Sequence, residues 1–320
     1  LLADVFTAFR RTSIRNTGLD PVYYYSLPGL SWQAALRQSR VQLELLSDYE
    51  MHCMIECGIR GGLSVATRHY AGARPGEHEI ITLDANSLYA WCMTQPLPIA
   101  DFRWVKEEEL GPEGWASLFP PDNLNAWPWF LGEKGYILEV DLDYPDTLHD
   151  RTATYPLAPN KEPIRECDMT RYMREQRMRS GPATKRIRTE YKLMGTQRDK
   201  RFYVLHYRTL RLYLDLGLQL RRIHRVIEFT QAPWLASYIE ANIERRKAAR
   251  TTFESDFFKK CNNSVFGKTQ EQKRNRTNFR LTVNEREMQR LIAKPHYEGS
   301  MIYSEELVGL YMKKTHVTLN

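Results

Sequence analysis

Two segments decide how the chain folds: ITLDANSLYAWCM at residues 81–93 and KKCNNSVFGK at residues 259–268. In the first segment, the apolar residues 81–83 predict the end of a buried strand. Asp84 follows where the backbone would leave a sheet, and there its carboxylate can be presented to a metal ion. The alternative is that Asp84 is an ordinary surface carboxylate.

The second segment is predicted to be helical. Helical spacing places three positions of this segment on one face: Lys259, Asn263 and then Phe266 or Gly267. An ammonium, an amide and an aromatic edge on one face suit a nucleoside triphosphate, because the cation can contact phosphate while the flat groups lie near sugar and base.

A pair of helices is predicted around this face, because the sequence between Pro233 and Gly267 contains neither glycine nor proline. Thr251 and Glu254 form a capping box that favours a turn near residue 251. The first helix then leads from an apolar base to a cationic tip, and three cations come to lie on facing helices: Arg246, Lys247 and Lys259. Alternatively, the first two of these pair with nearby glutamates on the surface.

The motifs carry a family resemblance. DxxSLY from Asp84, followed by KxxxNSx(Y/F)G from Lys259, resembles motifs A and B of family B DNA polymerases. Ile59-Arg60-Gly61-Gly62 resembles the YxGG element of the protein-primed branch, with isoleucine in place of tyrosine. Further stretches are similar, in order, to that branch as carried by Polinton/Maverick elements and related viruses: residues 3–10, 23–32, 155–161, 205–229 and 232–249.

The resemblance implies an α+β fold, a partial family B polymerase with an incomplete antiparallel palm sheet, a large insertion and helical fingers. It divides the chain into five parts: 1–29, the tail of an exonuclease domain and a linker; 30–98, a first palm segment with motif A; 99–232, an insertion resembling the terminal-protein region; 233–270, fingers with motif B; and 271–320, a return towards the palm.

The resemblance also implies roles for single residues. Asp84 would be catalytic and, with the backbone carbonyl of Ala85, would bind metal in an intact enzyme that uses two Mg²⁺ ions. Tyr89 would lie beneath the incoming deoxyribose; the alternative is a core aromatic. The implied nucleotide-binding residues are Ser87, Leu88, Tyr89, Arg246, Lys247, Lys259, Asn263, Phe266 and Gly267. The implied DNA-binding residues are Arg60, Gly61, Gly62, Lys268, Arg274 and Arg276.

Charge is distributed unevenly along the chain. Residues 1–160 contain 12 Lys+Arg and 21 Asp+Glu, whereas residues 161–320 contain 34 and 18, a net charge of +16. A positive half of this size suits a surface that follows phosphates, or else solvated helix faces. Its most basic stretch, residues 171–201, is interpreted as a DNA-contacting arm or as an exposed loop.

The five cysteines are too few and too scattered for a disulfide framework, so we expect a reducing, intracellular location such as a nuclear or viral replication site. His52, Cys53 and Cys57 have no second pair to complete a zinc site, which favours core thiols on a helix. No apolar run approaches the roughly 18 residues of a membrane span, and no membrane partner is expected.

A strand is predicted at residues 136–142. The DTD motif C of the family is absent from the sequence, and Asp141-Leu142-Asp143 lies between motifs A and B, as on an insertion strand. We therefore expect a fragment that is inactive alone. The intact protein is expected to perform protein-primed, template-directed DNA synthesis with primer-template DNA, deoxynucleoside triphosphates and a terminal priming protein as partners. The alternatives are a non-catalytic nucleic-acid-binding remnant and an unrelated basic scaffold protein.

Overall fold

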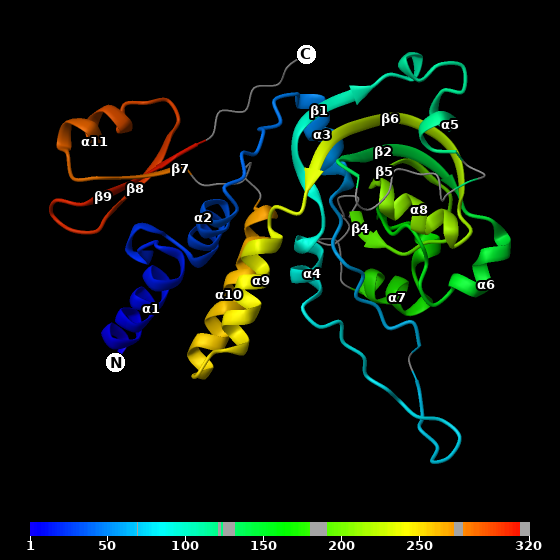
Figure 1. Cartoon of the computed structure of the whole chain (residues 1–320), viewed down its shortest axis with the longest axis horizontal. Helices are drawn as coiled ribbons and strands as arrows, with labels where there is room; N and C mark the ends of the chain where they lie inside the picture. The colour runs from blue at the N-terminus through cyan, green and yellow to red at the C-terminus, as the bar shows by residue number, and fades with distance from the viewer. Residues whose placement is uncertain (69, 121–122, 124–131, 180–190, 272–277, 314–320) are drawn as a thin grey trace. The chain divides into compact units, whose positions relative to one another are not determined.

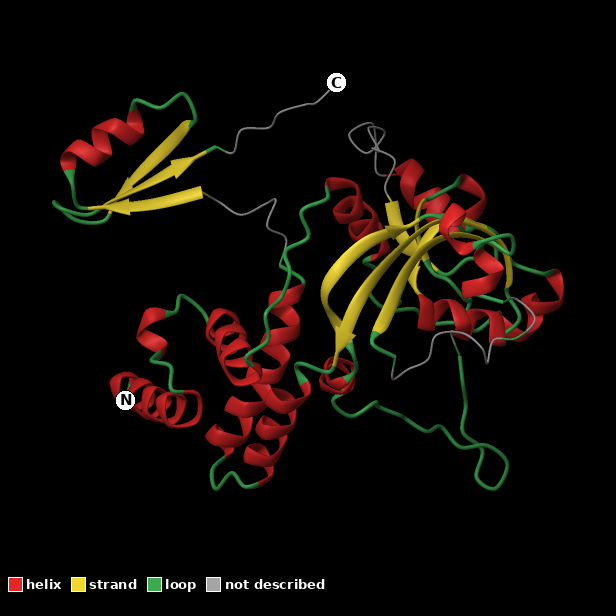
Figure 2. Ribbon diagram, turned by 45° about the horizontal axis from the view of Figure 1, so that its top comes forward, coloured by secondary structure: helices red, strands yellow, loops and turns green. Residues whose placement is uncertain are grey.

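A computed structural model describes residues 1–68, 70–120, 123, 132–179, 191–271 and 278–313. The chain forms two compact units, Leu1–Asn263 and Ser264–Asn320, and each is considered by itself. Helices and antiparallel sheets make up the described part (Figures 1 and 2), which confirms the mixed α+β class. No helix in these ranges is both long and apolar enough to span a membrane.

The first unit is built on a four-stranded antiparallel sheet with the order β1-β6-β2-β5. The strands are β1 (Leu97–Val105), β2 (Lys134–Asp143), β5 (Lys200–His206) and β6 (Gln219–Ala232). Alternate residues of β2 are buried, from Tyr136 to Leu142, because successive side chains of a strand point to opposite faces. This pattern confirms the strand that we predicted there.

Helices cover both faces of this sheet. On one face, α8 (Tyr207–Asp215) contributes the fully buried Leu210 to the core that contains Leu138. On the other face, α3 (Tyr49–Gly58) packs Met51 and Met54 against β5 and β6. The sheet is therefore the core of the unit and not an open surface.

The remaining elements around the sheet are short. They are the paired strands β3 (Asn160–Pro163) and β4 (Tyr191–Met194), the helices α5 (Trp115–Leu118), α6 (His149–Thr152) and α7 (Arg171–Arg179), and the single turns η1 (Pro21–Tyr23), η2 (Glu107–Leu110), η4 (Asp146–Leu148) and η5 (Glu166–Asp168).

A second part of this unit is helical. It contains α1 (Leu2–Thr17), α2 (Leu27–Ser39), α4 (Leu88–Thr94), α9 (Ala236–Lys247) and the larger part of α10 (Thr252–Thr269), a helix whose residues from Ser264 onward belong to the second unit. The turn between α9 and α10 is where the sequence predicts it. The Thr251 hydroxyl accepts a hydrogen bond from the Glu254 amide at 3.2 Å, and the Glu254 carboxylate accepts one from the amide of Arg250, one residue earlier than in a standard capping box.

The second unit combines one helix with a three-stranded antiparallel sheet of order β7-β9-β8. Its elements are β7 (Asn278–Thr282), α11 (Glu285–Ile292), β8 (Tyr297–Ile302) and β9 (Val308–Met312). Asn284 begins the helix, because its side-chain oxygen accepts hydrogen bonds from the amides of Arg286 and Glu287 at 2.9 and 3.2 Å.

The strand predicted at residues 81–83 is absent from the structure. Ile81 is 71% exposed and Leu83 is 89% exposed, and the backbone there belongs to no strand. A strand needs a neighbour to pair its amides and carbonyls, and no strand in the described ranges lies beside this segment. The four-stranded sheet instead comes wholly from residues 97–232, nearly all of which we predicted to be an insertion.

Over its described part, the basic stretch 171–201 is not one exposed loop, and the DNA-contacting arm stays a prediction. It contains α7 and β4, and Lys200 is 2% exposed, with its ammonium donating to the hydroxyl and carbonyl of Thr196 at 2.8 and 3.0 Å. Arg201 pairs with Asp143 at 2.9 Å. Residues 180–190, with Lys185, Arg186 and Arg188, lie outside the described residues.

The prediction of core thiols on α3 is right about the helix and wrong about Cys57, which is exposed, while Cys53 is half-buried. The buried positions of this helix are Met51 and Met54. These two residues face the sheet, whereas Cys57, in the last turn of the helix, is exposed to solvent.

Candidate nucleotide-binding site

The orientation of α10 is set by its apolar face. Phe257, Phe258 and Cys261 are buried and pack with side chains of α1 and α2. The opposite face is therefore left to solvent, and it carries Lys259, Asn263 and Gly267, all exposed, with Phe266 half-buried beside them. A Cβ atom added at Gly267 would meet nothing within 4 Å, so this face is open at the backbone as well.

Two buried asparagines join α10 to α9. The Asn242 amide donates to the Asn262 side-chain oxygen at 2.9 Å, and Asn262 in turn donates to the Ile239 carbonyl at 3.3 Å. Arg245 also donates to Asn242, at 3.1 Å. Our sequence reasoning missed Asn262. The available signal was its place four residues after Phe258, on the buried stripe of the helix.

The cations at the end of α9 are accessible. Arg246 and Lys247 are both exposed. Lys247 donates to Glu244 at 2.8 Å, which is the surface ion pair that we named as the alternative. Such an exposed pair contributes little free energy, so it can be exchanged for a phosphate contact. Within the part of the chain that the structure describes, no hydrogen bond or ion pair engages the side chain of Arg246 or Lys259.

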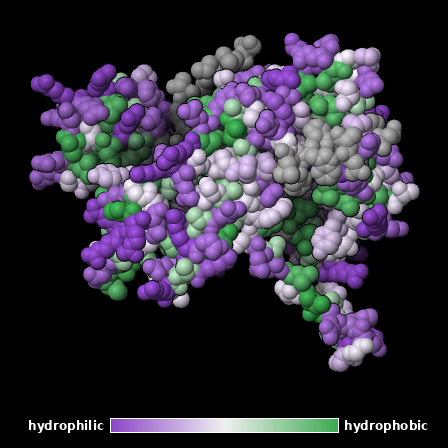
Figure 3. All heavy atoms as spheres, viewed as in Figure 1, coloured by the Kyte–Doolittle hydropathy of each residue, from purple (hydrophilic) through white to green (hydrophobic). Residues whose placement is uncertain are grey.

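The segment around Asp84 leads into α4. Asp84 and Ala85 are exposed, and Ser87 turns the backbone into the helix with φ 51° and ψ 39°, the left-handed region that few residues other than glycine adopt. Tyr89 is 52% exposed, so it is not a core aromatic. Leu88 is also exposed, and apolar side chains lie on the surface of this segment and the stretch before it (Figure 3).

The helix that begins within motif A, α4, lies close to the helix pair α9 and α10, of which α10 contains motif B. α4 packs against α9 (Figure 1), and α9 is bonded to α10 through the two asparagines. The chain thus brings α4, which begins four residues after Asp84, to the same helical group as Lys259 and Asn263. Two segments that are far apart in the sequence, α4 and the consecutive helices α9 and α10, therefore lie close together.

The metal prediction fits only in part. No group of three His, Cys, Asp or Glu side chains in the described residues could hold a metal ion. Asp84 and the Ala85 carbonyl are hard oxygen donors, and one Mg²⁺ held by such a pair together with the phosphates of a nucleotide matches the chemistry of that ion.

Arg60 is turned towards the protein. Its guanidinium donates to the Val204 carbonyl at 2.6 Å and lies 3.8 Å from the centre of the Tyr203 ring. Burial lowers the pKa of this side chain from its ordinary value. A DNA contact by Arg60 would break these interactions. Gly61 and Gly62, in contrast, are exposed, and a Cβ atom at either position would meet nothing within 4 Å.

The other predicted DNA contacts lie near the end of α10. Lys268 is half-buried and pairs with Glu271 at 2.6 Å. Arg274 and Arg276 lie outside the described residues.

Comparison with known proteins finds one kind of structural neighbour. No family model matches the chain, and no curated protein matches it. Phi29 DNA polymerase in complex with primer-template DNA and incoming nucleotides is similar with a TM-score of 0.45 and 12% identity, over 82% of this chain and 39% of that one. Phi29 DNA polymerase in a post-translocation complex with primer-template DNA gives 0.46 and 12%, over 92% and 41%. This chain thus spans about two fifths of those polymerases, and these values do not assign it to a family.

Proposed function

We propose that this chain is part of a DNA-directed DNA polymerase of family B, of the protein-primed branch typical of Polinton/Maverick elements and related viruses. The whole protein would perform template-directed DNA synthesis. The observation that carries the proposal is the solvent-facing side of α10, where Lys259, Asn263 and Gly267 lie together as the motif requires.

In this proposal α9 and α10 bind the triphosphate of the incoming nucleotide. Lys259 contacts phosphate, and Arg246 and Lys247 add positive charge from the end of α9. Charge-assisted contacts to phosphate are the strongest hydrogen bonds available here. They act on phosphoryl transfer by positioning the group and stabilising its charge. Asn263 and Phe266 then lie towards the sugar and base.

Asp84 and Tyr89 complete the proposed site. Asp84 and the Ala85 carbonyl would hold Mg²⁺, which when bound neutralises charge on the phosphates. No step is assigned to a second ion. Tyr89, half-exposed at the start of α4, would exclude a 2′-hydroxyl and so select deoxyribose, with Ser87 and Leu88 shaping the backbone beside it.

DNA would be bound by backbone and by charge. Gly61 and Gly62 leave room for a phosphate strand to approach the main chain, and Lys268, Arg274 and Arg276 would contact phosphates. Arg60 acts here by anchoring the turn to β5. A terminal priming protein would be a further partner of the whole polymerase.

One observation favours a second function, a non-catalytic nucleic-acid-binding remnant. In the described residues, no group of three or more His, Cys, Asp or Glu side chains could hold a metal ion. Such a remnant would keep the basic surface and bind DNA, but it would incorporate no nucleotides.

Primer extension by the protein encoded in the complete reading frame around these residues distinguishes the two. Asp84→Asn is expected to lower kcat by orders of magnitude with DNA binding nearly intact. Lys259→Ala should raise the KM for nucleotides about ten- to hundredfold, because it removes a charged contact worth roughly 1.5–3 kcal/mol. Glu240→Ala, on the neighbouring helix, is the control. Extension that is absent from the wild type while DNA is still bound would reject the polymerase function, and extension that is unchanged by Asp84→Asn would reject the catalytic role of Asp84.

A further inference from the structure

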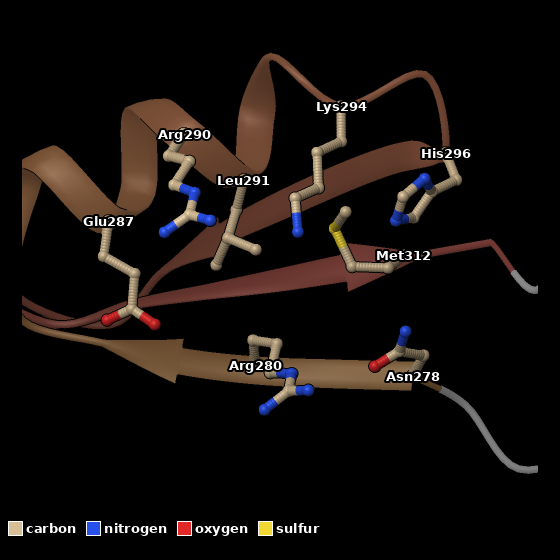
Figure 4. A pocket seen from close by; sticks show the side chains of 8 residues that line it. All are labelled: Asn278, Arg280, Glu287, Arg290, Leu291, Lys294, His296 and Met312. Atoms are coloured by element: carbon tan, nitrogen blue, oxygen red, sulfur yellow. The ribbon is translucent and has the colours of Figure 1, made fainter.

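The second unit contains a cavity of about 380 Å³ between α11 and its sheet (Figure 4). Arg280 of β7, Arg290 of α11, and Lys294 and His296 from the turn that follows α11 line it. Figure 4 shows the side chains of Arg290 and Lys294 extending from the helix and its turn towards the sheet. All the lining residues belong to this one unit.

Positive charge is concentrated in this cavity. The described residues of the unit contain six Lys or Arg and six Glu, but three of the cations and only Glu287 of the acids line the cavity. Glu287 already accepts a hydrogen bond from the Thr282 hydroxyl at 2.8 Å. The cavity therefore has a cationic excess that the described unit as a whole does not have.

The donors of these cations are free to bind a ligand. In residues 264–271 and 278–313, no hydrogen bond or ion pair engages the side chains of Arg280, Arg290 or Lys294. Arginine presents a planar fork that matches the oxygens of a phosphate, and lysine adds a compact charge. His296 and the Asn278 amide add N–H donors to the same wall.

We propose that this cavity is a binding site for a phosphate group. Its volume lies at the small end of the range for ligand sites, so the cavity has room for a phosphate ester. The phosphate can come from a free nucleotide or from a nucleic-acid strand, since both present the same oxygens. The site rests on the second unit alone and is independent of the proposed nucleotide site on α9 and α10.

The test compares two double variants of the 320-residue chain that each remove two positive charges from this unit. Arg280→Gln with Arg290→Gln changes the cavity, whereas Arg286→Gln with Lys313→Gln changes exposed cations that do not line it. Binding of inorganic phosphate, followed by the ³¹P linewidth, is expected to weaken at least about tenfold in the cavity variant only. Equal weakening in both variants, or in neither, would overturn the proposal.

A second measurement identifies the source of the phosphate. A dye-labelled single-stranded oligonucleotide is titrated at several salt concentrations, with its anisotropy as the readout. A strand in the cavity predicts that the cavity variant flattens the log–log salt slope by about 0.7, because the contact with one phosphate is lost. A free nucleotide as ligand predicts an unchanged slope together with weakened phosphate binding.

Two controls keep the result interpretable. Lys259→Gln is expected to leave phosphate binding in the cavity unchanged, so failure of the cavity site and failure of the α10 site are separate outcomes. If the cavity variant does not fold, two single variants of α11 replace the double variants: Arg290→Gln changes the cavity, and Arg286→Gln is its control. Equal phosphate affinities of the two single variants would reject the site.

Discussion

At the scale of single residues, adjacent side chains of α10 have opposite environments. Asn262 is 6% exposed and bonded to α9, whereas Asn263 is exposed on the proposed nucleotide face. Both are asparagines in the same helix, so their difference comes only from the 100° that a helix turns per residue. They therefore form a matched pair for separating folding from chemistry.

Asn262→Ala is expected to destabilise the chain by about 1–3 kcal/mol, because it leaves the buried Asn242 amide without its acceptor. Asn263→Ala should change the free energy of unfolding by no more than about 0.5 kcal/mol. Urea denaturation followed by circular dichroism measures both. Similar losses for the two variants would mean that Asn263 is also part of the packed interface.

Arg60→Ala is expected to cost about 1–3 kcal/mol of unfolding free energy, since it removes the bond to the Val204 carbonyl and the contact with the Tyr203 ring. Arg68→Ala, at an exposed arginine on the same connecting segment, is the control and should be neutral within about 0.5 kcal/mol. An Arg60→Ala variant that is as stable as the wild type but binds DNA more weakly would instead show that Arg60 contacts DNA.

At the scale of elements, α3 depends on its first turn. The Asp48 carboxylate accepts hydrogen bonds from the amides of Glu50 and Met51 at 2.8 and 3.1 Å and from the indole of Trp104 at 3.0 Å. The Met51 amide and then the indole are the main reasons why the pKa of Asp48 lies below its ordinary value of 3.8. Asp48 thus fixes both the first residue of α3 and the contact of this helix with β1.

This lowered pKa predicts acid sensitivity. The stability from Asp48 is fully present above the unfolded-state pKa and is lost as pH falls through the lower folded-state value. Asparagine still caps a helix but does not titrate. The unfolding free energy of the wild type should therefore fall more steeply below about pH 4 than that of Asp48→Asn, with parallel curves above about pH 6. Denaturation midpoints of the two proteins across this pH range check the prediction. Parallel curves at every pH would show that the Asp48 cap does not cause the acid sensitivity.

At the scale of the whole chain, part of the positive charge is used internally. Arg198 pairs with Glu162 and Asp168, and Arg225 pairs with Glu139 at 2.8 Å. The 34 Lys and Arg of residues 161–320 therefore overstate the number of cations that are available to a polyanion. The exposed cations of α9 and α10 are the better candidates for contact with nucleic acid.

The chain is expected to bind single-stranded DNA without sequence preference, with affinity that falls as salt rises from about 50 to 200 mM. Arg246→Gln combined with Lys259→Gln should flatten the log–log slope by about 1.4, as expected for two lost phosphate contacts. Arg225→Gln, which breaks an internal pair, should leave the slope unchanged. Anisotropy titrations provide the slopes. An equal effect of each substitution on the slope would mean that DNA binding depends on the net charge of the chain and not on these particular side chains.

Much of the fold could be predicted where the signal is local. The absence of glycine and proline with the Thr251 cap predicted α9 and α10, and the predicted strand at residues 136–142 is found within β2. The exposed shared face of Lys259 and Asn263 also followed from helical period. These features depend on residues within one or two turns of each other, so the sequence by itself determined them.

Tertiary structure alone decided the rest. Residues 81–83 have the composition of a buried strand but remain exposed, because strand formation requires a neighbouring ladder of hydrogen bonds. Arg60 was predicted to contact DNA, yet its partner, the Val204 carbonyl, is 144 residues away. The cavity beneath α11 likewise joins side chains from a strand, a helix and a turn. Such contacts depend on which distant segments pack together, and no local period or cap encodes that.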